Sequence, residues 1–198
     1  LERIAEQVID ASMTPETASQ RLAAMSVITA VRGSDALKML LDAAGDTDVA
    51  IRGGALRLAS GIPGSEATRK WINRYSKVSP PAKSGILYML GERGDELAVP
   101  LIVKALDDPS AEVSSAALFA LARLQGQAAV DQILSWILKY DSEEGHRAAS
   151  NALTSILDST GMPKIAAALP ESKGHSTVTL IRLLAWSGDK RYFRDVFR

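Results

Sequence analysis

The chain has 198 residues with no cysteine, and its 23 basic residues balance its 23 acidic ones, so the formal net charge is zero. The absence of cysteine excludes disulfides and thiolate metal sites, and the lack of a basic excess argues against the phosphate neutralisation on which nucleic-acid binding depends. Hydrophobic residues make up 46% of the chain, but no run approaches the roughly 18–20 apolar residues that span a membrane. We therefore expect neither nucleic-acid binding nor membrane insertion, and the cellular compartment stays unknown.

A sequence pattern recurs every 31 residues. Its first position is occupied by Arg21, Arg52, Lys83 and Ser114. Apolar residues follow three, six and seven positions later, and a glycine or, once, an aspartate follows twelve positions later. After residue 126 the spacing loosens, and we assign the next copies to Arg147, which lies 33 residues after Ser114, and to Val178, 31 residues further on. A fixed period of this size is typical of stacked-repeat proteins.

Each copy predicts two short helices, because apolar residues recur at helical spacing on both sides of a turn. In chain order the predicted pairs are about 2–11 with 15–32, 35–44 with 48–60, 65–76 with 79–91, 96–107 with 110–124, 127–140 with 143–159, and 162–169 with 174–187. A last helix, over about 189–198, has no partner in the sequence.

Turn residues separate the predicted helices. Aspartates stand near helix starts at Asp46, Asp48, Asp107 and Asp108. We interpret them as capping residues, because they lack the twelve-residue loop of a helix-loop-helix calcium site. Glycines, which accept the left-handed backbone of a helix C-terminus, stand at positions 33, 61, 64, 91, 94, 126, 161 and 188. The tripeptide Arg93-Gly94-Asp95, an adhesion motif by its letters, falls on one of these turns and is interpreted as a turn.

The predicted last helix is apolar where the end of a stack is usually polar. It carries Tyr192, Phe193, Val196 and Phe197. Either this helix packs back on the preceding pair, or the chain continues into a further repeat or domain. The chain also begins with leucine. We therefore expect residues 1–198 to form a single repeat domain that is a fragment of a longer protein.

The fourth copy carries a family resemblance most clearly. Residues 98–113 read AVPLIVKALDDPSAEV, and residues 114–124 read SSAALFALARL. This arrangement of a Pro-Leu-rich helix, an Asp-Asp-Pro turn and then Ala and Leu columns resembles HEAT repeats, specifically the short HEAT-like variety of bacterial proteins and phycobilin lyases. The copy departs from the family pattern by placing Ser114 where a cation is usual. The resemblance implies an all-α fold, a right-handed α-α superhelix (α-solenoid) of about six helix pairs.

The first position of the pattern has a structural meaning within this resemblance. The resemblance implies that the cations at this position pair with turn aspartates or with turn carbonyls. These cations are Arg21, Arg52, Lys83 and Arg147. A cation near a helix start is not placed to complement the helix dipole, so we expect it to reach across to a neighbouring segment.

A second set of residues, five positions after the first, points toward function. It consists of Ser26, Arg57, Tyr88, Phe119, Ala152 and Leu183. Since the apolar positions form the buried stripe of each second helix, this position should point away from the core. The resemblance implies that second helices line a concave face. Arg57, Tyr88 and Phe119, extended by Leu183 and Trp186, would then form a peptide-binding row. The alternative is that these side chains fill gaps between helices.

The two histidines offer a weaker signal. His146 lies beside Glu143 and Glu144 at a predicted helix start, a combination that could bind a cation or act in acid–base chemistry. A solvated first helical turn, where acidic residues complement the dipole, explains the same residues. His175 lies in a different repeat register, and nothing in the sequence pairs it with His146. We expect no metal and no cofactor.

These observations favour a non-catalytic module that binds a protein or peptide on its concave face, either a separate partner or a neighbouring domain of the same polypeptide. One alternative is a structural spacer between domains of a larger enzyme. Another is an enzyme resembling the HEAT-like bilin lyases or DNA glycosylases. A glycosylase would need a basic cleft with a catalytic carboxylate, and neither appears in the predicted row.

Overall fold

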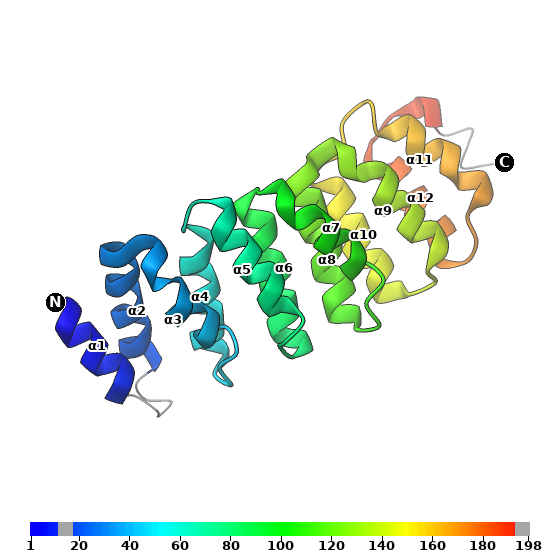
Figure 1. Cartoon of the computed structure of the whole chain (residues 1–198). Helices are drawn as coiled ribbons and strands as arrows, with labels where there is room; N and C mark the ends of the chain where they lie inside the picture. Colours follow the sequence, from blue (N-terminus) through cyan, green and yellow to red (C-terminus); the bar gives the residue numbers. More distant parts are fainter. Residues whose placement is uncertain (12–17, 193–198) are drawn as a thin grey trace. The chain divides into compact units, whose positions relative to one another are not determined.

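The computed structural model describes residues 1–11 and 18–192, and within these ranges all regular structure is helical (Figure 1). The chain divides into two units, Leu1–Leu101 and Ile102–Arg198. The all-α fold is therefore confirmed, and in each unit the helices follow one another as stacked pairs. The handedness of the superhelix stays a prediction.

In the first unit, three helix pairs follow one another. They are α1 (Glu2–Ala11) with α2 (Ala18–Arg32), α3 (Leu37–Ala43) with α4 (Val49–Ser60), and α5 (Ser65–Tyr75) with α6 (Pro80–Arg93). Each first helix packs on its own second helix, and the second helices also pack on one another, α2 on α4 and α4 on α6. The second helices thus form a continuous layer within this unit.

The boundary between the units falls within α7 (Val99–Ala105), and the second unit repeats the arrangement of the first. Its further helices are α8 (Ala111–Gln125), α9 (Val130–Lys139), α10 (Glu143–Thr154), α11 (Met162–Ala168) and α12 (His175–Trp186). The second helices again pack on one another, α8 on α10 and α10 on α12, while α9 and α11 pack on α10 and α12. Figure 1 shows α10 and α12 behind the helices α9 and α11.

The sequence pattern places the helix ends well, with three corrections. The helix predicted over 143–159 ends at Thr154, where the hydroxyls of Thr154 and Ser155 donate to carbonyls three residues back and compete with the helical hydrogen bonds. Gly91 marks no turn, because it is buried inside α6. Of the predicted last helix, Lys190–Tyr192 form a 3-10 turn, and the rest of it, Phe193 included, lies outside the described residues.

The buried stripe of each second helix fixes the repeat register. In α4, α6 and α8, three buried residues stand at fixed offsets from the first position: one residue before it, three residues after it and seven residues after it. In α4, where the first position is Arg52, they are Ile51, Ala55 and Ala59. In α10 the equivalent buried residues are Gly145, Ala149 and Leu153, and in α12 they are Ser176, Leu180 and Leu184. The first position is therefore His146, then Thr177. The predicted assignment to Arg147 and Val178 is wrong by one residue.

The physical cause of this register lies in α9. Trp136 is buried, and a Cβ atom on Gly145 would lie 2.4 Å from its ring carbon Cη2. Only a glycine allows α10 to approach Trp136 this closely, which sets the residue that begins the buried stripe. Trp136 is itself held by its indole N–H, which donates to the Leu106 carbonyl at 2.9 Å. The spacing between the first positions of α8 and α10 is thus one residue longer than the 31-residue period, and not two residues longer as predicted.

Candidate functional site

The residues five positions after the first, called the +5 residues below, are exposed in every second helix once the register is corrected. They are Ser26, Arg57 and Tyr88 in the first unit, and Phe119, Asn151 and Arg182 in the second. Tyr88 and Phe119 are 43% and 39% exposed. The predicted exposure of Leu183 is wrong, because this residue is 1% exposed and belongs to the buried stripe of α12, as Ala152 does in α10. Trp186 is 58% exposed at the end of α12.

In the first unit, two +5 residues line a shallow groove between α4 and α6. The groove has a volume of about 250 Å³, and its lining includes Arg57 and Tyr88 with Gly53, Gly85 and Met89. It is hollow because two glycines supply no side chain where the helices meet. A Cβ atom on Gly85 would lie 2.6 Å from Cδ1 of Leu56, so α4 and α6 pack at close range at this point. The result is a mostly apolar hollow that has the guanidinium of Arg57 and the phenol of Tyr88 in its lining.

Two of the cations at the first position contact a turn, and a third contacts an aromatic ring at a helix end. Arg21 donates to Asp46 at 3.2 Å, and Arg52 donates to the carbonyls of Asp46 and Thr47 at 2.9 and 3.1 Å. The ammonium of Lys83 lies 5.4 Å from the centroid of the Tyr75 ring. These contacts hold neighbouring segments together, as expected for residues with a structural role. Arg147 differs: it is exposed, and the first position of its helix is occupied by His146.

The turn aspartates divide into two roles. Asp48 caps α4 by accepting from the N–H of Ala50 at 2.7 Å, and Asp46 accepts from the N–H of Asp48 at 2.9 Å. Asp107 caps no helix. Its carboxylate instead accepts from Tyr140 Oη at 2.7 Å and from Lys139 Nζ at 3.0 Å, and these bonds, the tyrosine first, lower its pKa. The capping interpretation is thus correct for Asp48 and wrong for the other three. Asp46 and Asp108 accept from N–H groups inside their turns, and Asp107 links successive helix pairs.

Arg93 anchors a turn and does not present an adhesion motif. Its guanidinium donates to the carbonyls of Ala59 at 2.9 Å and Gly64 at 3.0 Å, to the Ile62 carbonyl, and to the Thr68 hydroxyl at 3.2 Å. Burial lowers the pKa of this guanidinium from its ordinary value. The side chain therefore closes the turn between α4 and α5 from the end of α6.

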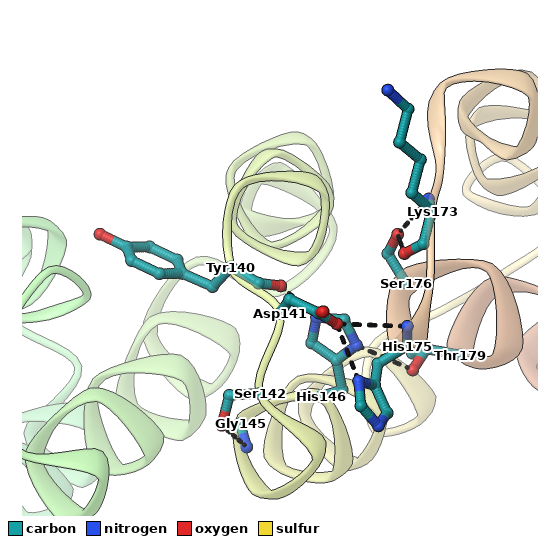
Figure 2. A network of polar contacts seen from close by, with 9 residues as sticks. All are labelled: Tyr140, Asp141, Ser142, Gly145, His146, Lys173, His175, Ser176 and Thr179. Carbon is teal, nitrogen blue, oxygen red and sulfur yellow. Dashed lines mark hydrogen bonds and ion pairs between the residues drawn. The ribbon is translucent and has the colours of Figure 1, made fainter.

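In the second unit, the two histidines lie together (Figure 2). His146 is 3% exposed, and its Nε2 lies 2.6 Å from the Tyr140 carbonyl, so Nε2 carries a proton and donates. Its Nδ1 lies 3.3 Å from the Thr179 hydroxyl. The ring of His175 stands edge-on to it, with the ring centroids 6.2 Å apart. His146 is thus a buried, hydrogen-bonded residue and not part of a solvated turn, whereas Glu143 and Glu144 are exposed as expected.

Asp141 holds His175 in place. One oxygen of its carboxylate accepts from Nδ1 of His175 at 2.8 Å and from the backbone N–H of His175 at 3.3 Å (Figure 2). These two bonds, the side-chain bond first, lower the pKa of Asp141. Asp141 thereby also satisfies a free N–H at the start of α12. Sequence reasoning missed this group, although both histidines lie at the starts of second helices in successive pairs, where their side chains can meet.

A polar pocket of about 780 Å³ opens beside the histidines, between α10 and α12. The +5 residues Asn151 and Arg182 line it, together with Arg147, Glu143 and Glu144. No cluster of three potential metal ligands occurs among the described residues. The pocket therefore offers guanidinium, amide and imidazole groups for hydrogen bonding to a ligand.

Comparison with known proteins relates part of the chain to a repeat family. Residues 68–154, which run from α5 to the end of α10, match the model of HEAT repeats. No curated protein sequence is significantly similar to the chain. Within the described ranges, no helix combines the length and the hydropathy needed to cross a bilayer. Kinship with phycobilin lyases and a bacterial origin stay predictions. HEAT repeats commonly serve as protein-interaction scaffolds. Residues 68–154 of this chain are similar to them in sequence, and the stacked helix pairs agree with a helical repeat fold.

Proposed function

We propose that the chain is a non-catalytic interaction module that binds a protein or peptide through the exposed face of its second helices. One observation carries the proposal: in each unit a hollow lies between two neighbouring second helices, and two +5 residues line it. Arg57 and Tyr88 line the groove between α4 and α6, and Asn151 and Arg182 line the pocket between α10 and α12. The same position thus offers a binding surface in both units.

The residue types at this position suit peptide recognition. Tyrosine and arginine are enriched among the residues that dominate binding energy at interfaces, because each combines a large contact area with hydrogen-bonding groups. Phe119 adds a further exposed aromatic ring. All of these side chains stand on helices that pack on a neighbouring second helix of their unit, so little backbone order has to be gained on binding. Leu183, buried in α12, is not part of the proposed surface.

A selection from a random peptide library tests the proposal. The immobilised chain is compared with a Tyr88→Ser, Phe119→Ser double variant whose helix content is checked by circular dichroism. A Val31→Ser, Val49→Ser variant serves as a matched control, because these valines are 60% and 71% exposed and lie outside the +5 set. If either aromatic residue is a hot spot, peptides should bind the double variant at least about 30-fold more weakly.

Each outcome has a defined meaning. Peptides that bind the parent chain and the valine variant, but not the aromatic double variant, would support the proposed surface. Peptides that bind all three equally would place the binding site elsewhere on the chain. If the parent chain selects no peptides, the structural-spacer alternative is favoured over partner binding.

A further inference from the structure

The pocket between α10 and α12 contains two arginines without an ionic partner. Arg147 on α10 and Arg182 on α12 both line it. Among the described residues neither guanidinium takes part in an ion pair, whereas Arg21, Arg32 and Arg191 each pair with a carboxylate. Two positively charged groups that share one pocket repel each other, and because neither is ion-paired with the pocket's Glu143 or Glu144, an anionic ligand that contacts both arginines would relieve this repulsion.

The local sequence does not neutralise these two charges. Glu143 stands four residues before Arg147, a spacing and an orientation that favour an ion pair within a helix, yet the two side chains form none in the described structure. Arg182 has Val178 and Trp186 four residues away on either side, so its own helix offers no carboxylate at this spacing. Asp141, beside the pocket, already accepts two hydrogen bonds from His175. The arginines are therefore available to a ligand.

The remaining lining indicates which anion fits. Glu143 and Glu144 stand exposed in the first turn of α10, where their charge complements the helix dipole. They would repel a long run of phosphates, as in a nucleic acid, more strongly than one or two carboxylates placed near the arginines. A guanidinium binds a carboxylate through two parallel hydrogen bonds. The pocket volume of about 780 Å³ lies within the range of roughly 300–1,000 Å³ that is usual for ligand-binding pockets.

We propose that the pocket between α10 and α12 binds acidic side chains of a peptide partner, with Arg147 and Arg182 each receiving a carboxylate. This inference rests on the proposed function, because it assigns a chemistry to the partner at one of the two hollows. Arg182 is itself a +5 residue, so the acidic side chains would contact the same position of a second helix that Arg57 and Tyr88 occupy in the first unit. The partner is thus a peptide with two acidic residues close together in its sequence.

The test titrates the whole chain with a small probe and follows two-dimensional NMR spectra, including the Nε–H signals of the arginines. The probe is acetyl-Glu-Leu-Glu-amide, and its neutral counterpart is acetyl-Gln-Leu-Gln-amide. An Arg147→Gln, Arg182→Gln variant removes both guanidinium groups. An Arg3→Gln, Lys104→Gln variant changes the net charge equally at two exposed positions outside the pocket and serves as its control. Inorganic phosphate is titrated separately.

We expect the acidic probe to shift the Arg147 and Arg182 signals and the neutral probe not to shift them. The arginine variant should bind the acidic probe at least about tenfold more weakly than the parent, because each charge-assisted hydrogen bond is strong, and the control variant should bind unchanged. Equal weakening in both variants would overturn the proposal, since it would show a general charge effect. Tighter binding of phosphate at the same signals would also overturn it, by assigning the pocket to a phosphate group.

The two proposals fail in different ways. If the acidic probe does not bind while selected peptides still depend on Tyr88 and Phe119, the inference about carboxylates falls and the proposed function stands. If the probe binds at the two arginines while no selected peptide depends on the aromatic residues, the aromatic surface falls and the carboxylate pocket stands.

Discussion

Replacing Arg93 with methionine removes four hydrogen bonds while retaining an unbranched apolar stem. Three of the acceptors are main-chain carbonyls in or near the turn between α4 and α5, and the fourth is the hydroxyl of Thr68. A hydrogen bond from a charged donor contributes about 1.5–3 kcal/mol, but Arg93 is partly exposed and water takes over part of each lost bond. We therefore expect the variant to lose about 3 kcal/mol of unfolding free energy.

Urea denaturation measures this loss, and native-state hydrogen exchange locates it. Because each helix pair in a stack contacts only its neighbours, the amides of α4 and α5 should exchange faster in the variant, while those of α10 serve as an internal reference. An Arg93→Lys variant keeps the charge but lacks the forked donor, so it should lose about half as much. A loss below about 0.5 kcal/mol, or faster exchange throughout the chain, would refute the view that Arg93 anchors this turn.

Two further substitutions test packing and electrostatics. Gly53→Ala should raise the melting temperature, because its Cβ atom would meet nothing closer than 3.7 Å and alanine favours a helix by about 0.8–1.0 kcal/mol. Gly54→Ala should lower it, because its Cβ atom would lie 2.0 Å from Cδ2 of Leu22; a rise in both variants, measured by thermal circular dichroism, would contradict the close packing of α2 on α4. Asp141→Asn should reduce stability near pH 6 but not in acid. His175 lowers the pKa of Asp141 in the folded state, so the contribution of Asp141 is complete above the ordinary aspartate pKa of about 4 and is lost as the pH falls below it. Melting temperatures of parent and variant should therefore converge as the pH is lowered from about 4 through the lowered pKa of Asp141, and a difference that grows in acid would contradict this assignment.

Short-range signals in the sequence were sufficient for most of the fold. Helix pairs could be predicted because apolar residues recur at helical spacing, and a helix of this kind is stable only when its apolar stripe is covered by another helix. The N-cap at Asp48 followed from local chemistry, since an aspartate directly before a helix can accept from the free N–H groups of the first turn. The exposure of Arg57, Tyr88 and Phe119 followed from the same helical spacing.

The register of the last two pairs could not be obtained in this way. His146 and Arg147 are adjacent and both polar, and matching by residue type selected the arginine because cations occupy the first position of earlier copies. Burial selects the histidine, because both of its ring nitrogens lie near polar atoms of the fold, the Tyr140 carbonyl and the Thr179 hydroxyl. A buried arginine would have needed more acceptors than this site contains.

The sequence by itself determined that the chain is a stack of helix pairs and which residues of α2, α4, α6 and α8 are exposed at the +5 position, because both depend on spacings shorter than one repeat. Only the tertiary structure decided which side chains from different repeats meet. Asp141 and His175 lie 34 residues apart and form a hydrogen bond. Arg147 and Arg182 line one pocket although they stand on different helices. Such neighbours depend on how two helices are rotated against each other, and that rotation is set by the packing of residues such as Trp136 against Gly145, which no local spacing records.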